Sequence, residues 1–371
     1  DYEQYAIERD KKISESLKKN KIEFNKYKDQ VIYEDKEILT QSNSPYTIFT
    51  PYKNNYLKKI FNEGISHYDC DSYMGNLAKF DSEAFPSIKE IGFEKSNLSS
   101  MTVPLGTKGG LDLIDNFKSR IKNYNTDRNF PGTKGVSYLS VHNRFGTVSI
   151  RHLAKIAINH SSEGASTWLN ELIWRDFYFQ ILSNFPHIQT GKSFKNKYNN
   201  LKFENDEEKF SAWKKGSTGF PIVDAGMRQL NTTGYMHNRL RMIIACFLVK
   251  DLLIDWRWGE KYFAENLIDY DFSANNGGWQ WAASTGCDAQ PYFRIFNPTL
   301  QSEKFDPDGK FIKKYIPELE LLSKKEIHQP SVFFNKSPDN FPIELGVNYP
   351  FPIVNHAEQK VKIMSIFKDV D

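Results

Sequence analysis

Cysteine is scarce in this sequence, and long apolar runs are missing. Cys70, Cys246 and Cys287 are widely spaced and form no CxxC pair. This spacing argues against disulfides and a zinc site, and it favours a reducing, intracellular setting. No apolar run approaches the roughly 20 residues that a transmembrane helix needs, and no signal peptide is visible. We therefore expect a soluble cytoplasmic protein that does not associate with membranes.

Several common catalytic motifs are also absent. The chain has no GxGxxG after a strand, no Walker loop, no GxSxG and no HExxH, so a dinucleotide, if bound, is not held by a Rossmann fingerprint. Asp269 and Asp271 flank Tyr270, but no third ligand follows, and we expect no metal site. Recognition of a ribose or of ring amide groups suits the two acids equally well. The formal charge of +3 is mild and does not by itself indicate nucleic-acid binding.

The sequence is rich in aromatic residues and helical patterns. Its 371 residues are 39% hydrophobic and 15% aromatic, which supports a substantial core and leaves room for two domains. We expect a surface helix within 1–28, a strand at 31–39 and a connector with few periodic segments at 43–105. Apolar periodicity predicts a mainly α fold, with helices at 108–123, 149–158, 164–184, 221–231, 234–255, 259–282 and 356–368.

Two of the seven tryptophans lie in the segment NNGGWQW (275–281), and the other five precede it from Trp168 on. In a helix, Trp279 and Trp281 would lie about 200° apart and face different neighbours. Trp279 would then point inward on the face of Asn275, and Trp281 would point towards an opening. The alternative is an Asn-Gly hairpin turn followed by core tryptophans. The crowding of tryptophans favours redox or stacking chemistry.

Two further helices carry polar groups among apolar ones. On the first, Trp168, Glu171 and Arg175 fall at i, i+3 and i+7, with Trp174 three residues after the acid. A solvated Glu171–Arg175 pair is the simple interpretation, but the aromatic neighbours imply burial, and a buried carboxylate needs a partner or a purpose.

On the second helix, Asn238, Arg241 and Met242 share a face that we expect to rim a cavity or to contact phosphate, while Arg239 points elsewhere. His237, just before this face, is expected to be a hydrogen-bonded structural residue. The apolar second half of this helix is expected to lie in the core.

Long stretches of the chain resemble the DNA photolyase and cryptochrome family, and most closely the class I cyclobutane pyrimidine dimer photolyases. The resemblance covers essentially the whole chain. It rests on TWLNELIWRDFY (167–178), GFPIVDAGMRQLNTTGYMHNRLRM (219–242), FLVKDLLIDWRWGEKYF (247–263), LIDYDFSANNGGWQWAASTGCDAQPYFRIFNP (267–298) and FTPYKNNYLK (49–58).

The resemblance implies a helical FAD-binding catalytic domain at 105–371, an interdomain linker at 43–104, and at 1–42 the C-terminal remnant of an α/β, Rossmann-like antenna domain. Because the chain begins at Asp1 without methionine, we expect an upstream part to be missing. A folate-type antenna chromophore is then possible in the full-length protein, with Glu8 as a relic of its site. We do not expect this chain to bind one.

The family likeness also assigns cofactor residues. A U-shaped FAD, active as FADH⁻, is implied, with Asn275 beside flavin N5, where a neutral amide suits a reduced flavin. The positions that match the cofactor site are Tyr124, Val136, Ser137, Leu139 and Ser140 around the phosphates, and Trp168, Arg241, Asp269, Asp271 and Asn275 along the rest. The VSYLS segment (136–140) independently offers hydroxyls and consecutive amides that suit phosphate.

The implied substrate is UV-damaged DNA with pyrimidine dimers, bound by a monomeric bacterial-type enzyme. Excited FADH⁻ would donate an electron to the dimer, the ring would split, and the electron would return. Glu171 would hydrogen-bond the dimer carbonyls and stabilise the arriving charge. The implied pocket for the flipped dimer is formed by Glu171, Trp174, Asn238, Met242 and Trp281, with Arg175 and Arg239 as DNA contacts at its rim.

Family members usually relay electrons to oxidised flavin through three tryptophans. Trp279 and Trp256 match the first two positions, but Phe203, a poor redox relay, stands at the third. Trp213, Tyr198 and Trp258 are alternative candidates for the third residue of the relay. Repair needs only reduced flavin, so this departure concerns photoreduction and not catalysis.

Three other functions are alternatives to repair of cyclobutane dimers. A cryptochrome-like flavin photoreceptor without repair activity is disfavoured by Glu171, Asn275 and the two pocket tryptophans. A (6-4) photolyase would carry histidines at two places on the face where Asn238 and Met242 stand. A plain flavin reductase is least favoured, since nothing suggests a nicotinamide site.

Overall fold

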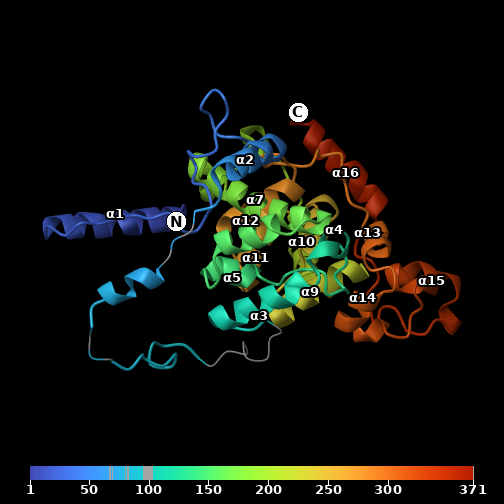
Figure 1. The fold of residues 1–371 in the computed structure, drawn as a ribbon. Helices are drawn as coiled ribbons and strands as arrows, with labels where there is room; N and C mark the ends of the chain where they lie inside the picture. Colours follow the sequence, from blue (N-terminus) through green and yellow to red (C-terminus); the bar gives the residue numbers. More distant parts are fainter. Residues whose placement is uncertain (67, 69, 80, 82, 95–102, 371) are drawn as a thin grey trace.

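The computed structural model describes residues 1–66, 68, 70–79, 81, 83–94 and 103–370, and nearly all regular structure in this part of the chain is helical (Figure 1). Its β pairing is limited to two isolated bridges, Leu39 with Pro45 and Leu345 with Tyr349. The predicted mainly α fold is therefore confirmed. Within these residues no helix has both the length and the apolar character that a membrane span requires.

The longer helices follow the chain in the order α1 (Gln4–Lys19), α2 (Phe49–Glu63), α3 (Gly106–Lys118), α4 (Tyr124–Asp127), α5 (Ser140–Phe145), α6 (Ile150–Ile158), α7 (Glu163–Asn184), α8 (Glu207–Lys215), α9 (Pro221–Thr233), α10 (Asn238–Lys250), α11 (Trp256–Asn266), α12 (Phe272–Ala282), α13 (Pro298–Phe305), α14 (Lys310–Tyr315), α15 (Pro330–Lys336) and α16 (His356–Lys368). Short 3₁₀ helices lie between them: η1 (Asp71–Asn76), η3 (Ile121–Asn123), η4 (Pro186–Thr190), η5 (Asn196–Asn200), η6 (Pro317–Leu319), η7 (Glu326–His328) and η8 (Pro338–Asn340).

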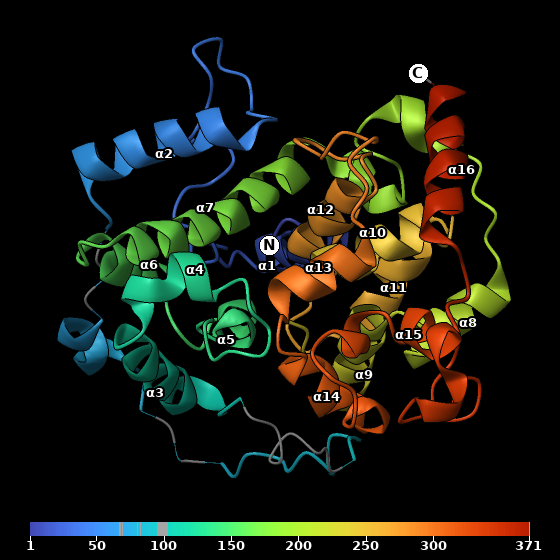
Figure 2. The same cartoon turned by 90° about the vertical axis from the view of Figure 1, so that its right-hand side faces the viewer.

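Two buried clusters make up most of the core. One surrounds α7 and includes apolar side chains of α2, α3 and α6. The other is built from α9, α10, α11 and α12. Because α12 packs against α7 on one side and against α10 and α11 on the other, it lies where the two clusters meet (Figure 2).

Helix ends differ from the periodic pattern where a side chain caps the backbone. The single helix expected at 259–282 is wrong: α11 stops at Asn266, and α12 starts after Asp271, whose Oδ1 accepts the N–H of Ala274 at 3.0 Å. The helix expected at 234–255 begins only after His237, whose Nδ1 accepts the N–H of Arg239 at 3.2 Å. Apolar periodicity runs through such caps, so it does not reveal them.

The strand expected at 31–39 is also wrong, because this segment binds a helix and not a sheet. The backbone N–H groups of Ile32 and Tyr33 donate to Oδ2 of Asp176 on α7, at 2.9 and 3.4 Å. The Tyr56 hydroxyl of α2 donates to the same oxygen at 2.6 Å. Asp176 is almost fully buried, with Arg175 nearby at 3.7 Å. One carboxylate thus ties two N-terminal segments to α7.

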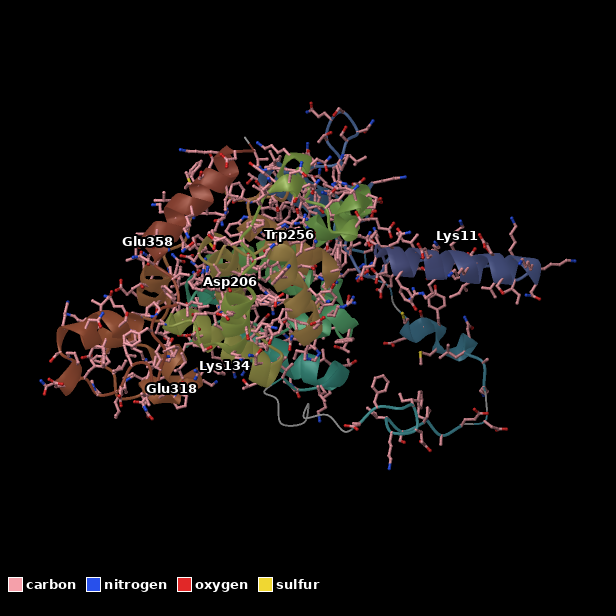
Figure 3. The ribbon with its side chains drawn as sticks, turned by 180° about the vertical axis from the view of Figure 1, so that it is seen from behind. Lys11, Lys134, Asp206, Trp256, Glu318 and Glu358 are labelled. Carbon is pink, nitrogen blue, oxygen red and sulfur yellow. The ribbon has the colours of Figure 1, made fainter. Side chains whose placement is uncertain are left out.

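The expectation of a connector with few periodic segments is consequently wrong for α2, which buries Phe49, Tyr52, Tyr56 and Ile60 against α7 (Figures 1 and 2). The domain boundaries after residues 42 and 104 stay a prediction. The expected surface helix within 1–28 is confirmed as α1, which buries only Ala6 and extends away from the helical body, as the position of Lys11 in Figure 3 shows.

The last helix is held by two charged residues at the end of α10. Asp251 is fully buried and lies 2.5 Å from His356 Nδ1. Lys250 is equally buried; its ammonium donates to Ser284 Oγ at 3.1 Å and lies 3.9 Å from the ring centroid of Phe367. A cation–π contact therefore replaces part of the lost hydration of the ammonium.

This buried lysine predicts a pH-dependent stability. Burial lowers the pKa of Lys250 to about 7, whereas an unfolded lysine titrates near 10.4. Between these values the unfolded state binds more protons, so the stability contribution of Lys250 rises with pH. From pH 7 to 9 we expect it to add about 2–3 kcal/mol to the free energy of unfolding.

Chemical denaturation of Lys250→Met beside the parent protein isolates this contribution. Burial raises the pKa of Asp251 to about 6 and that of the Cys246 thiol to about 11, and because all the compared proteins keep both groups, their contributions cancel in the comparison. Lys250→Met should lose this additional rise of the free energy of unfolding with pH. Lys261→Met, at an exposed position, should keep it. Equal pH slopes in all three proteins would contradict the assignment.

Candidate functional site

A cavity of about 480 Å³ opens between α5, α7, α10 and α12. Most residues predicted from the sequence as functional meet on its walls, although they come from widely separated parts of the chain. Those that line it are Ser140, Glu171, Trp174, Arg175, Asn238, Arg241, Met242, Asp269, Asp271, Asn275, Trp279 and Trp281. Beyond these, Arg128, Asn143, Arg144, Tyr178 and Phe263 also reach it.

The two tryptophans of α12 face different surroundings. Trp279 is 2% exposed and packs against Phe263, with ring centroids 4.9 Å apart, whereas Trp281 is half-buried on the cavity wall. The different neighbours predicted from their spacing are confirmed, although both rings reach the same cavity, and the hairpin alternative is wrong, because the whole segment lies within α12. Gly259 of α11 makes room for the inner ring, since a Cβ there would lie 2.1 Å from Cη2 of Trp279.

One end of the cavity presents an ion pair and an oriented amide. Arg241 Nη2 donates to both carboxylate oxygens of Asp269, at 3.0 and 2.8 Å, and its Nε donates to the Met236 carbonyl at 2.9 Å. Asn275 Nδ2 donates to the Glu260 carbonyl at 3.1 Å, which fixes the side chain on the wall. This end therefore offers fixed donors and acceptors to a polar ring system.

The other end combines an acid with aromatic walls. Glu171 Oε1 lies 2.5 Å from Arg128 Nη1. The solvated Glu171–Arg175 pair is therefore wrong, since Arg175 instead donates to the Gln30 carbonyl at 2.6 Å. Sequence reasoning missed Arg128, which follows the short α4 and belongs to no periodic pattern.

Trp174 is held by a residue of α2. Its ring stacks on Phe49 with centroids 3.6 Å apart and an interplanar angle of 9°, and Phe49 N–H donates to Asp288 Oδ2 at 3.0 Å. Sequence reasoning also missed this support, because Phe49 lies far from the tryptophan in the chain. The position of α2 therefore sets the position of one cavity wall.

Several predicted cofactor residues lie behind the wall. Tyr124 and Trp168 are buried, and both pack against Phe117, at 5.6 and 4.9 Å between ring centroids. Leu139 is buried just before α5. A second cavity, of about 530 Å³, lies on the side of Tyr138, and neither of these two cavities is lined by Tyr124, Val136, Ser137, Leu139 or Trp168.

Arg239 lies beside the first cavity and not on its wall. Its guanidinium donates to Asn129 Oδ1 at 2.6 Å, approaches Met242 Sδ at 3.6 Å and lies 4.4 Å from the Phe305 ring centroid. Its role as a DNA contact stays a prediction. The structural role expected for His237 agrees with its position, since burial, reinforced by nearby arginines, lowers its pKa to about 3 and keeps the ring neutral.

The residues predicted as the electron relay have different surroundings. Trp279 lines the cavity, Trp256 is buried at the start of α11, as Figure 3 shows, and Phe203 is half-buried between two apolar clusters. In the described part of the chain, no three His, Cys, Asp or Glu side chains are grouped as ligands for a metal ion. Cys70, Cys246 and Cys287 are free thiols.

The chain matches two protein-family models and is similar to curated proteins along its length. The family model for the FAD binding domain of DNA photolyase matches residues 168–369, and the DNA photolyase model matches residues 1–66. The deoxyribodipyrimidine photo-lyase of Vibrio cholerae is 38% identical, over 99% of this chain and 78% of its own length.

Two solved structures are similar along nearly the whole chain. A class III photolyase from Agrobacterium tumefaciens has a TM-score of 0.86 at 32% identity, covering 100% of this chain and 78% of that one. A cryptochrome from Synechocystis has a TM-score of 0.82 at 29% identity, covering 99% and 77%.

Proposed function

Because this chain belongs to the DNA photolyase and cryptochrome family, we propose that it is a deoxyribodipyrimidine photo-lyase, which uses light and bound FAD to split cyclobutane pyrimidine dimers in DNA. The observation that carries the proposal is one cavity lined by two different groups of side chains, here called its polar end and its opposite end. The Arg241–Asp269 pair and Asn275 make up the polar end, and Glu171, Trp174 and Trp281 make up the other. The cavity therefore suits a polar cofactor ring beside a pair of apolar bases.

The polar end fits a flavin. The Arg241 guanidinium supplies donors, Asp269 and Asp271 supply acceptors, and Asn275 supplies an amide beside the buried ring of Trp279. When bound, reduced FAD supplies the photoexcited electron that opens the cyclobutane ring. The protein residues hold the ring in place and set the charge around it. Tyr124 and the 136–140 segment remain proposed contacts of the FAD phosphates, and Trp168 remains a proposed contact of the rest of the cofactor.

The opposite end suits a flipped pair of pyrimidines. Extruding bases from a duplex costs a few kcal/mol, least at damaged sites, and stacking on an aromatic ring recovers about 1–3 kcal/mol per base. Trp281 offers such a surface, and Trp174 is held rigid by Phe49. Asn238 and Met242 complete this wall.

The ion pair of Glu171 indicates which protein groups would hydrogen-bond the pyrimidines. Glu171 Oε1 accepts from Arg128 Nη1 at 2.5 Å, which leaves the other carboxylate oxygen as a further acceptor. Glu171 is therefore suited to a pyrimidine ring N–H, and the remaining N–H groups of Arg128 are suited to the carbonyl oxygens. Donors fixed at those oxygens stabilise the negative charge that arrives during splitting.

Binding to damaged DNA should weaken as salt is raised. Arg175 and Arg239 are the proposed DNA contacts, and each phosphate neutralised by a basic group releases counterions. With two or more such contacts, raising NaCl from 50 to 200 mM should lower the affinity at least about tenfold. Fluorescence anisotropy with a dimer-containing oligonucleotide measures this effect, with flavin absorbance as the control for cofactor retention. An affinity that does not change with salt would contradict phosphate binding.

Three oligonucleotides separate the candidate functions. The flavin-loaded, chemically reduced protein is illuminated with undamaged DNA, with DNA containing a cyclobutane dimer, and with DNA containing a (6-4) photoproduct. We expect restored thymines only from the cyclobutane dimer. Repair of the (6-4) photoproduct would assign the other photolyase branch, and loss of neither lesion would favour the cryptochrome-like photoreceptor.

We further propose that the enzyme acts as an intracellular monomer. Size-exclusion chromatography with light scattering, with and without the damaged oligonucleotide, tests the oligomeric state. A stable dimer in both conditions would contradict it.

A further inference from the structure

Behind the cavity, Trp279 packs against a second set of aromatic rings, and the repair reaction does not use them. Trp213 of α8 lies 6.2 Å from Trp279, measured between ring centroids at an interplanar angle of 66°. Trp213 is fully buried, and its other neighbours include Tyr262 of α11 at 5.7 Å. Tyr262 is half-buried, and its hydroxyl donates to Asn231 Oδ1 at 2.8 Å near the surface. These three oxidisable rings thus connect the cavity wall to solvent.

The route through Trp256 is less suited to carry an oxidation. No close ring contact joins Trp256 to Trp279 among the described residues, and the route would end at Phe203, which does not oxidise readily.

We propose that oxidised flavin in this protein is photoreduced along Trp279, Trp213 and Tyr262, and not through Trp256 and Phe203. The proposal rests on the proposed function, because it requires a flavin in the cavity that Trp279 lines. Trp258 is a weaker end point than Tyr262, since Phe210 separates it from Trp213, at 5.7 and 5.2 Å between centroids. Tyr198 lies in a separate cluster with Phe367.

The electrons and protons balance as follows. One electron passes from Trp279 to the photoexcited oxidised flavin, and Trp279 regains one from Trp213, which in turn takes one from Tyr262. The indole N–H of Trp213 is buried without an acceptor, so an oxidised Trp213 keeps its proton and remains a strong oxidant. The Tyr262 hydroxyl lies near solvent and releases its proton to water as it loses the electron. A soluble thiol then returns one electron and one proton to the Tyr262 radical. Two thiols that have each lost one electron combine into a disulfide.

Photoreduction of single variants separates the two routes. The flavin-loaded, oxidised protein is illuminated with a thiol, and the rate is followed by flavin absorbance. We expect Trp213→Phe to abolish most of the photoreduction, while Trp256→Phe and the matched control Trp258→Phe retain most of it. Phe203→Trp should change the rate little. The proposal is overturned if Trp256→Phe abolishes photoreduction and Trp213→Phe does not, or if Phe203→Trp alone accelerates it strongly.

A spectroscopic measurement on Tyr262→Phe tests the route even if Trp213→Phe does not fold. After a light flash, the parent protein should show a long-lived tyrosyl radical by electron paramagnetic resonance, and Tyr262→Phe should lack it. Tyr262 is half-buried, so this variant removes only a hydroxyl from the edge of the core. A long-lived radical that is unchanged in Tyr262→Phe would overturn the proposed end point.

Failure of this route can be told apart from failure of the proposed function. Dithionite-reduced Trp213→Phe should still split cyclobutane dimers in light, because repair starts from reduced flavin. Normal repair together with photoreduction through Trp256 would reject only the route. Absence of repair in every flavin-loaded protein, the parent included, would reject the proposed function itself.

Discussion

Trp281→Ala is expected to weaken binding of dimer-containing DNA about five- to hundredfold, with little change in flavin content. The half-buried Trp281 ring lines the cavity together with Trp174 and Glu171. Removing one stacking surface costs about 1–3 kcal/mol of binding free energy. Fluorescence anisotropy with damaged and undamaged oligonucleotides of the same sequence measures the loss.

The undamaged oligonucleotide is the internal control for this prediction. Its binding depends on phosphate contacts, so Trp281→Ala should leave it nearly unchanged. Trp281→Phe should recover part of the preference for damaged DNA, because a smaller aromatic surface remains. Equal losses for both oligonucleotides would show that Trp281 acts through general DNA binding and not through the lesion.

Asp269→Ala is expected to remove most of the bound flavin and to destabilise the protein. The Asp269 side chain is 2% exposed, and its partner Arg241 is 28% exposed. Removing the carboxylate leaves a partly buried guanidinium without its charge partner, which costs about 3–5 kcal/mol in buried pairs. The ratio of flavin to protein absorbance after purification and the free energy of unfolding measure the two effects.

A surface pair provides the matched control. Glu265 and Lys261 lie 3.9 Å apart with side chains 58% and 77% exposed. Glu265→Ala should change the free energy of unfolding by less than about 1 kcal/mol and should keep the flavin. Full flavin occupancy in Asp269→Ala would refute the assignment of this pair to the cofactor.

The sequence predicts many of the longer helices because apolar residues recur in them at helical spacing, most clearly in α6 and α9. α6, α7, α9 and α16 match their predicted ranges closely, and the different neighbours of Trp279 and Trp281 follow from helical geometry alone. The assignment of cavity residues to cofactor and substrate depends instead on the family resemblance. No periodic pattern distinguishes a residue that binds flavin from one that binds a base.

The remaining errors arise from single long-range contacts. The 31–39 segment has the apolar content of a strand, but among the described residues only its Leu39 forms a β bridge, and two of its N–H groups donate to Asp176 on α7 instead. In the same way, Glu171 pairs with Arg128, which lies 43 positions away, and not with Arg175 on its own helix. Local propensity cannot anticipate partners that only the folded chain brings together.

The most direct test of the account is dimer splitting counted flash by flash. Chemically reduced, flavin-loaded protein is mixed in excess with a dimer-containing oligonucleotide, and restored thymines are measured after each flash and in a dark control. We expect thymine to accumulate with the number of flashes and to be absent in the dark. No restored thymine, with reduced flavin and damaged DNA both shown to be bound, would contradict the proposed photo-lyase activity.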